Sequence, residues 1–182
     1  MVRIACIGSR DISLWTAAIM EKIGEVIVLS GGYIATGNAL GSDAAFARGG
    51  NRVSPSHVIL YLPWKTYNEE LIVEKNLVTW QDNPEWEFIA RAHHPVYDQL
   101  SKGAKQMMNR NAGILSRANA CIAFLNHSKQ GFGGTGHGWR IAGTKAIPRF
   151  DLATFNPHNR EDSARLEEFL KKLLTKDQNA VG

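Results

Sequence analysis

The chain has 182 residues, of which 44% are hydrophobic and 21% are charged. These proportions are those of an average globular protein, and the absence of internal repeats and low-complexity segments from the sequence excludes a repeat architecture. The net charge of +4 is compatible with a polyanionic partner but does not identify one.

Nothing in the sequence points to a membrane or to an oxidising compartment. No apolar run is long enough to span a bilayer, and the first residues lack the layout of a signal peptide. We therefore expect a cytoplasmic protein with no membrane partner. Cys6 and Cys121 lie far apart inside apolar runs, which predicts buried thiols rather than a disulfide or a metal site. The sequence assigns no metal and no cofactor.

Short apolar runs alternate with helical patterns along the first third of the chain. The runs are nearly continuous, which is typical of strands that are covered on both faces of a parallel sheet. Pairs of glycines follow both helical patterns and are expected to end the helices. The predicted elements are strands at 2–7, 33–36 and 57–62, and helices at 13–30 and 42–48 that end at Gly31-Gly32 and Gly49-Gly50. This alternation predicts right-handed crossovers in a parallel sheet.

An aromatic segment at about 64–95 interrupts the pattern, and we interpret it as an insertion. The further predicted elements are helices at 84–94, 97–118, 139–142 and 160–176, and strands at 121–125 and 146–150. The last helix has a leucine-rich stripe and is expected to pack on the sheet or at a subunit interface. The whole chain, 1–182, is therefore predicted to be a single α/β domain with a doubly wound, mainly parallel, five-stranded sheet and helices on both faces.

The stretch at 33–43 combines a short strand, a turn and the start of a helix. Gly37 and Gly41 lie where the strand must turn sharply, and glycine there lets the backbone adopt a positive φ and lets a ligand approach closely. The first turn of the helix then presents unpaired N–H groups and the positive end of its dipole, which suits a phosphate. An ordinary turn between a strand and a helix is the alternative interpretation.

Three such loops follow three predicted strands. In a doubly wound sheet, loops at the carboxyl ends of the strands line one crevice where the strand order reverses. The residues expected to meet there are Gly8, Ser9, Arg10, Thr36, Gly37, Asn38, Gly41, Ser42, Asp43, Gly133, Gly134, Thr135 and Gly136. Their main-chain N–H groups and hydroxyls predict an anionic ligand, most naturally the phosphate of a nucleotide. The absence of both of their glycine motifs argues against ordinary NAD enzymes and P-loop ATPases.

These motifs resemble the Rossmann domain of DprA, the DNA-processing and recombination-mediator protein, within the SLOG superfamily. The similar parts are 8–10, 36–45, 48–49, 110–111 and 133–142, and the resemblance spans roughly residues 3–150. It implies a Rossmann-like sheet, a phosphate-binding pocket that includes Arg110 and Asn111, binding of single-stranded DNA in DNA processing or recombination, and a homo-oligomer. The flanking helical and winged-helix domains of DprA have no obvious counterpart in the sequence.

The same superfamily includes the Lonely Guy phosphoribohydrolases, so an enzyme that cleaves N-glycosidic bonds of nucleotides is an alternative. Those enzymes have a glutamate shortly after the glycine-threonine loop, whereas residues 135–140 contain no acid. Asp43 and His137 are then the candidates for catalysis, since a carboxylate must reach the ribose and histidine titrates near neutral pH. A non-catalytic sensor of a nucleotide-derived ligand is a further alternative.

Several side chains have both a ligand-binding and an ordinary interpretation. Arg10 can neutralise a phosphate or lie in solvent, and Asp43 can bind a ribose hydroxyl or cap a helix. Lys65 and Arg140 are further candidates for phosphate contacts. The tryptophans at 64, 80 and 86 can stack on bases or pack in the core.

Overall fold

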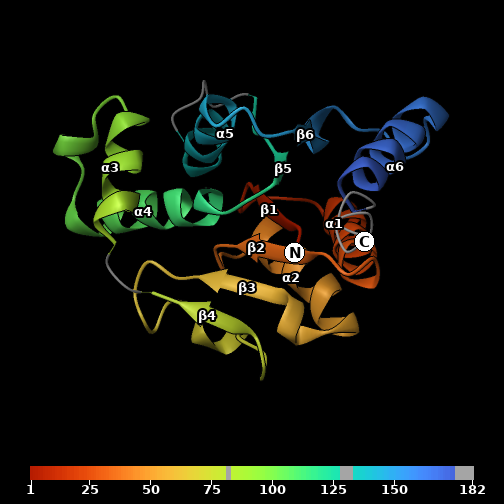
Figure 1. The fold of residues 1–182 in the computed structure, drawn as a ribbon, viewed down its shortest axis with the longest axis horizontal. Coiled ribbons are helices and arrows are strands. Elements are labelled where there is room, and N and C mark those ends of the chain that lie inside the picture. The colour runs from red at the N-terminus through yellow and green to blue at the C-terminus, as the bar shows by residue number, and fades with distance from the viewer. Residues whose placement is uncertain (81–82, 128–132, 175–182) are drawn as a thin grey trace, which may run out of the picture.

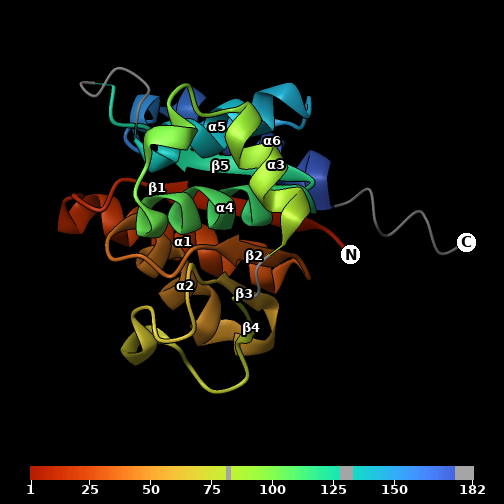
Figure 2. The same cartoon turned by 90° about the vertical axis from the view of Figure 1, so that its left-hand side faces the viewer.

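The computed structural model describes residues 1–80, 83–127 and 133–174. Within these ranges the strands form one parallel sheet of six strands in the order β4-β3-β2-β1-β5-β6. The strands are β1 Arg3–Gly8, β2 Tyr33–Thr36, β3 Val58–Tyr61, β4 Leu77–Thr79, β5 Ala120–Phe124 and β6 Arg149–Asp151. Figure 2 shows β5, β1, β2, β3 and β4 in this order from top to bottom.

The parallel α/β architecture is confirmed, but the predicted count of five strands is wrong. The additional strand, β4, has three residues and lies at the edge of the sheet beside β3. Its first residue, Leu77, is 47% exposed, so the strand has no continuous apolar run that a sequence pattern could reveal. It lies inside the segment that we interpreted as an insertion.

Helices cover both faces of the sheet. They are α1 Leu14–Leu29, α2 Ser42–Val53, α3 Pro84–Ala92, α4 Lys102–Ser116, α5 Gly134–Thr144 and α6 Arg160–Leu174. Alternate side chains of β1 belong to different cores: Ile4 and Cys6 pack with α1, α2 and α6, whereas Ala5 and Ile7 pack with α3, α4 and α5. Figure 1 shows α3, α4 and α5 together at the upper left and α1 and α6 at the right.

The second helix is longer than expected, because the pair Gly49-Gly50 does not end it. α2 continues to Val53 and packs closely against α1. A Cβ atom on Gly49 would lie 1.9 Å from the carbonyl oxygen of Glu21, and one on Gly24 would lie 2.4 Å from that of Phe46. Gly24 and Gly49 therefore permit the close approach of α1 and α2. The sequence pattern had suggested that Gly49-Gly50 was a stop signal for the helix.

Other boundaries differ by a few residues. The helix expected at 97–118 is divided into a 3-10 turn at Tyr97–Gln99 and α4, and the strand expected at 146–150 is β6. The Ser101 hydroxyl caps the N-terminus of α4, because it accepts a hydrogen bond from the N–H of Ala104 at 3.3 Å. α5 begins at Gly134, so the glycine loop forms the first turn of that helix. The last two residues of the helix predicted at 160–176 lie outside the described ranges.

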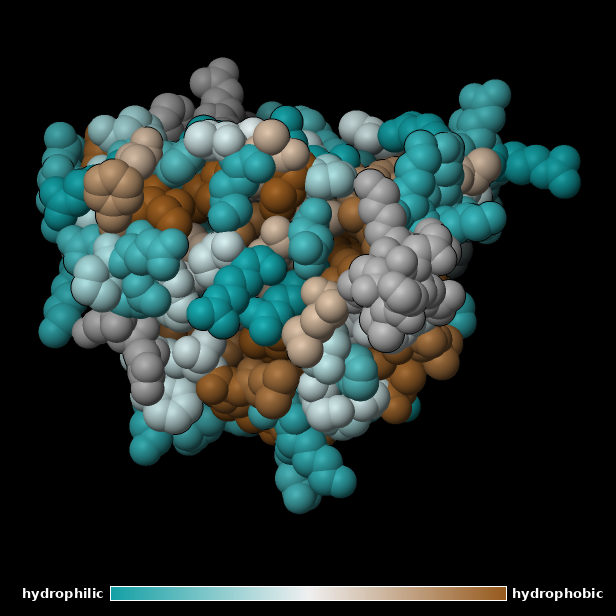
Figure 3. Space-filling view, in the orientation of Figure 1, coloured by the Kyte–Doolittle hydropathy of each residue, from teal (hydrophilic) through white to brown (hydrophobic). Residues whose placement is uncertain are grey.

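The predictions for the last helix and for the two cysteines are confirmed. α6 packs on the sheet through Leu166, Leu170 and Leu174. Cys6 and Cys121 are buried and free, and burial raises the pKa of Cys121 to about 12. Among the described helices, none has the length and apolar character needed to cross a membrane. In Figure 3, hydrophilic side chains are interspersed with hydrophobic ones over the face shown, which is ordinary for a surface exposed to water.

Candidate functional site

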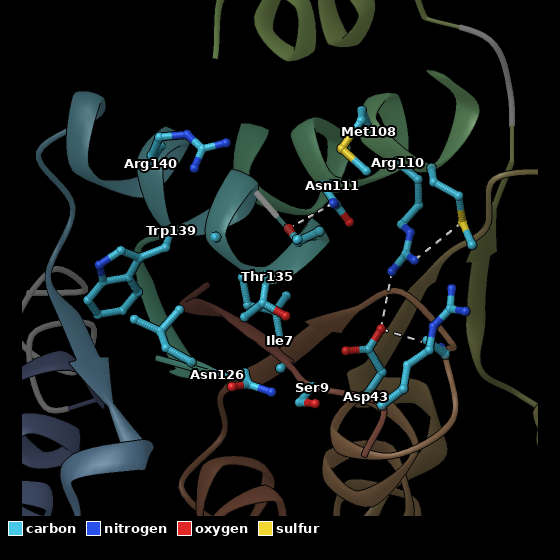
Figure 4. Close-up of a pocket in the computed structure, with 18 of the residues that line it drawn as sticks. Ile7, Ser9, Asp43, Met108, Arg110, Asn111, Asn126, Thr135, Trp139 and Arg140 are labelled. Atoms are coloured by element: carbon cyan, nitrogen blue, oxygen red, sulfur yellow. Dashed lines mark hydrogen bonds and ion pairs between the residues drawn. The ribbon is translucent and has the colours of Figure 1, made fainter. Parts of the chain in front are cut away.

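A cavity of about 680 Å³ lies at the carboxyl ends of β1 and β5, where the order of the strands reverses (Figure 4). Helix α4 covers one side of it, and the first turns of α5 cover another. Its lining includes Gly8, Ser9, Arg10, Asp43, Arg110, Asn111, Gly133, Gly134, Thr135 and Gly136, all of which the sequence singled out. The predicted crevice therefore corresponds to a real cavity at the position where doubly wound sheets bind ligands.

The rest of the predicted set lies outside the lining: Thr36, Gly37, Asn38, Gly41, Ser42 and His137. The first and third loops reach the cavity with their backbones, whereas the second reaches it through Asp43 and Ala39. Apart from Ala39 and Asp43, the second loop supports the other residues of the site and does not line the cavity, as its hydrogen bonds show.

Ser42 and Gly41 hold the first loop in place. Both the N–H and the hydroxyl of Ser42 donate to the carbonyl of Ser9, at 3.1 and 2.8 Å. Gly41 has φ +81°, and a Cβ there would lie 2.3 Å from the carbonyl oxygen of Arg10. Only glycine combines this backbone conformation with such close contact.

Asn38 joins the second loop to the aromatic segment. It is buried, has φ +57°, and its side-chain amide donates to the carbonyls of Tyr67 and Asn68 at 3.1 and 3.0 Å. The Asn68 amide returns a hydrogen bond of 2.8 Å to the carbonyl of Asn38. The Tyr67 hydroxyl in turn accepts a hydrogen bond of 3.2 Å from Arg10. The side chain of Asn38 thus binds carbonyls of the protein's own backbone. The hydroxyl of Tyr67 holds the side chain of Arg10 at the cavity.

A buried ion pair joins α2 to α4. The Oδ2 atom of Asp43 accepts hydrogen bonds from Nη1 of Arg110 at 3.1 Å and from the N–H groups of Gly37 and Ala39 at 3.2 and 3.3 Å. Asp43 therefore binds the turn that precedes α2 and does not cap the helix. Burial raises the pKa of Asp43, although Arg110 opposes this effect. The N–H group of Gly37, which we expected to face a phosphate, is thus occupied by this carboxylate.

Glycine at position 37 makes room for the ion pair. A Cβ atom on Gly37 would lie 1.2 Å from Nη1 of Arg110. The Nη2 atom of the same guanidinium lies 3.6 Å from the sulfur of Met107, and its centre lies 6.0 Å from the centroid of the Tyr67 ring. Within the described chain, Nε of Arg110 is a buried donor without a hydrogen-bond partner.

The start of α5 forms the opposite part of the cavity. Its cap is Gly133, which has no side chain, and the N–H groups of the first turn have no partner inside the helix. The Asn111 amide donates to the carbonyl of Gly134 at 3.0 Å and so fixes the turn against α4. Thr135 adds a hydroxyl to the lining. The positive end of a helix and nearby arginines together favour a bound anion.

His137, the candidate acid–base residue, does not reach the cavity. Its side chain is fully buried, and its Nε2–H donates to the carbonyl of Ala90 at 3.1 Å. Burial lowers the pKa of His137 to about 4, so the imidazole is neutral at pH 7. It connects α3 to α5, and the ring of His94 lies edge-on to it at 5.8 Å.

The neutral state of His137 makes the stability of the protein depend on pH. Because the folded-state pKa lies below the unfolded value of 6.5, the unfolded chain binds a proton between pH 6.5 and 4 that the folded chain does not. The free energy of unfolding is therefore expected to fall by about 3 kcal/mol as the pH drops through this window. His94, whose pKa burial also lowers, acts in the same direction, whereas Asp43 opposes it.

Urea unfolding at pH 7 and at pH 4.5 measures this effect. The variant His137→Gln keeps an amide donor for Ala90 and should be less sensitive to pH than the wild type. The exposed residue His158 supplies the control, since His158→Gln should retain the full dependence on pH. An equal pH dependence in all three proteins would contradict the prediction.

Sequence reasoning missed part of the lining: Ile7, Asp11, Ala39, Ala104, Met107, Met108, Leu125, Asn126, His127 and Trp139. Helical spacing could have identified the residues on α4, because 104, 107, 108 and 111 lie on one helical face. His127 Nε2 lies 2.8 Å from a carboxylate oxygen of Asp151, a contact between segments that no local pattern reveals.

The other expected ligand groups are divided between the cavity and the surface. Arg140 lines the cavity, and its Nε donates to the carbonyl of His93 at 3.1 Å. Lys65 lies outside the lining, 5.9 Å from the centroid of the Trp80 ring. Trp86 packs on Tyr61, with ring centroids 5.6 Å apart. Trp64 and Trp80 are 38% and 41% exposed.

No family model and no curated protein matches the chain. Among solved structures, it is similar to DNA processing protein A from Helicobacter pylori, whose structure is described as showing a single-stranded DNA binding mode. The TM-score is 0.61 and the sequence identity is 16%, over 98% of this chain and 81% of that one. At this identity the likeness shows the fold, and it confirms what the glycine motifs implied: the chain forms a DprA-like α/β domain.

Proposed function

We propose that the protein binds single-stranded DNA through phosphates placed in the cavity between β1 and β5. The observation that carries this proposal is the convergence of the start of α5, Arg10 and Arg110 on one cavity at the reversal of strand order. The DNA-binding mode named for the Helicobacter pylori protein supports the same ligand class. A role in DNA processing or recombination is the biological setting that we propose.

The electrostatics of the cavity favour a phosphodiester. The N–H groups of the first turn of α5 supply donors, and the exposed guanidinium of Arg10 supplies a charge braced by Tyr67. Arg110 is buried, and its charge is balanced by Asp43, but its Nε donor has no partner among the described residues. Such contacts hold the sugar-phosphate backbone and do not distinguish base sequence.

Cleavage or sensing of a free nucleotide is the second candidate function. The observation that favours it is the presence of the Asp43 carboxylate in the lining of the cavity. Three donors already hold its Oδ2 atom, which favours a structural role for this carboxylate over reaction with a ribose. Release of free base from nucleoside monophosphates would support the enzymatic alternative. The structure contains one chain, so the homo-oligomer implied by the resemblance stays a prediction.

Arg10→Ala is expected to weaken binding of a single-stranded oligonucleotide by about tenfold at low salt. One lost phosphate contact should also reduce the slope of log K against log salt concentration by about 1. Fluorescence anisotropy with a labelled oligonucleotide across a salt series measures both quantities.

Arg52→Ala is the matched control, because it removes the same charge from the far end of α2, outside the cavity. It should keep the wild-type slope. A wild-type protein that fails to bind at low salt would refute the proposed function. An unchanged slope in Arg10→Ala would show that Arg10 does not contact phosphate.

A further inference from the structure

The cavity holds more apolar surface than a phosphate site requires. Besides its donors and charges, the lining includes the side chains of Ile7, Met107, Met108, Leu125 and Trp139. Phosphate contacts need hydrogen-bond donors and positive charge, and an indole ring provides little of either. In Figure 4, Trp139 and Arg110 lie on opposite sides of the cavity, with Thr135 between them. We therefore expect the side of the cavity that contains Trp139 to bind a part of the ligand other than its phosphate.

The ring of Trp139 is held from outside the cavity by β6. The guanidinium of Arg149 lies 4.7 Å from the ring centroid, and its Nη1 donates to the carbonyl of Trp139 at 3.2 Å. Gly143 leaves space for this arginine, since a Cβ there would lie 2.7 Å from Nη1. A cation against an aromatic ring is an attractive contact. The indole is thus fixed before any ligand arrives, which lowers the entropy that binding must overcome.

The helix sets the spacing between this ring and the phosphate donors. Trp139 follows Thr135 by four residues in α5, so the two side chains lie on the same helical face, one turn apart. One turn advances by about 5.4 Å, which leaves room for a sugar between a phosphate at the first turn and a base at the second.

We infer that Trp139 is the stacking platform of a base subsite. The nucleotide whose phosphate binds the start of α5 places its base on this indole, while Met108 and Leu125 add apolar lining. This inference rests on the proposed binding of nucleotide phosphates and adds the group that the apolar side of the cavity recognises. Stacking tolerates any base, so the subsite detects the presence of a base more strongly than its identity.

Two probes with equal phosphate charge test the subsite: a thymidine hexamer and a hexamer of abasic deoxyribose phosphates. The wild type should prefer the thymidine hexamer by about 5- to 150-fold, the equivalent of 1–3 kcal/mol for one stacked base. Trp139→Ala should lose this preference and keep the affinity and salt dependence measured with the abasic hexamer. Trp80→Ala, which removes an exposed tryptophan outside the cavity, should keep the preference.

A second measurement does not depend on the alanine variant folding. Trp139→Phe keeps an aromatic side chain, and circular dichroism can check its fold. The thymidine hexamer should quench the tryptophan fluorescence of the wild type and of Trp80→Phe, and this quenching should be lost in Trp139→Phe.

The outcomes separate the inference from the proposal on which it rests. Equal affinity of the wild type for both hexamers, with ordinary salt dependence, would overturn the base subsite and leave the phosphate site in place. Undiminished preference in folded Trp139→Ala, or undiminished quenching in Trp139→Phe, would also overturn it. Binding to neither hexamer at low salt would refute the proposed function itself.

Discussion

Asp43→Ala is expected to lower the free energy of unfolding by about 3–5 kcal/mol, because it leaves the Arg110 guanidinium buried without its counter-charge. The side chains of Asp43 and Arg110 are 5% and 8% exposed, so water cannot replace the lost carboxylate easily. The N–H groups of Gly37 and Ala39 would lose the same acceptor. For a domain of ordinary stability this loss is a large fraction of the total.

Urea unfolding monitored by circular dichroism measures the change. Glu25→Ala is the control, since it removes an ion-paired carboxylate from the surface of α1 and should have a far smaller effect. The double variant Asp43→Ala with Arg110→Met should be more stable than Asp43→Ala, because it removes the uncompensated charge. If Asp43→Ala cost no more than Glu25→Ala, the ion pair would not be the contact that holds the turn to α4.

Gly49→Ala is expected to destabilise the protein by about 1–3 kcal/mol or more, although alanine normally favours a helix. The new methyl group would lie 1.9 Å from the carbonyl oxygen of Glu21, and this neighbour is backbone that cannot rotate away. The two helices must move apart, which also disturbs the start of α2 at the candidate site.

The chain contains its own control for this substitution. Gly103 lies in α4, and a Cβ atom there would meet nothing within 4 Å. Gly103→Ala should therefore raise the free energy of unfolding by about 0.4–1 kcal/mol, mainly by restricting the unfolded chain. If thermal or urea unfolding shows that Gly49→Ala lowers the free energy of unfolding and Gly103→Ala raises it, the requirement for glycine at position 49 by packing is confirmed. Stabilisation by both substitutions would contradict the close helix approach.

The sequence determined the parallel α/β class and the position of the candidate site. Nearly continuous apolar runs such as that of β1 require cover on both faces, and loops at the carboxyl ends of parallel strands must share one edge. These rules depend only on local patterns and on the handedness of the chain. They were enough to name Arg10 and the glycines of α5 as residues that line one cavity, whereas Arg110 was named through the resemblance to DprA.

Only the tertiary structure decided which polar groups remain available to a ligand. Asn38 and His137 are candidate ligand groups in the sequence, but each makes its hydrogen bonds to carbonyls of segments remote along the chain. Asp43 is also occupied, by Arg110 on α4 and by N–H groups of its own turn. Trp139, which the sequence pattern did not single out, is held in place by Arg149. Hydrogen bonds and packing between distant segments depend on the folded geometry, and a local pattern carries no record of them.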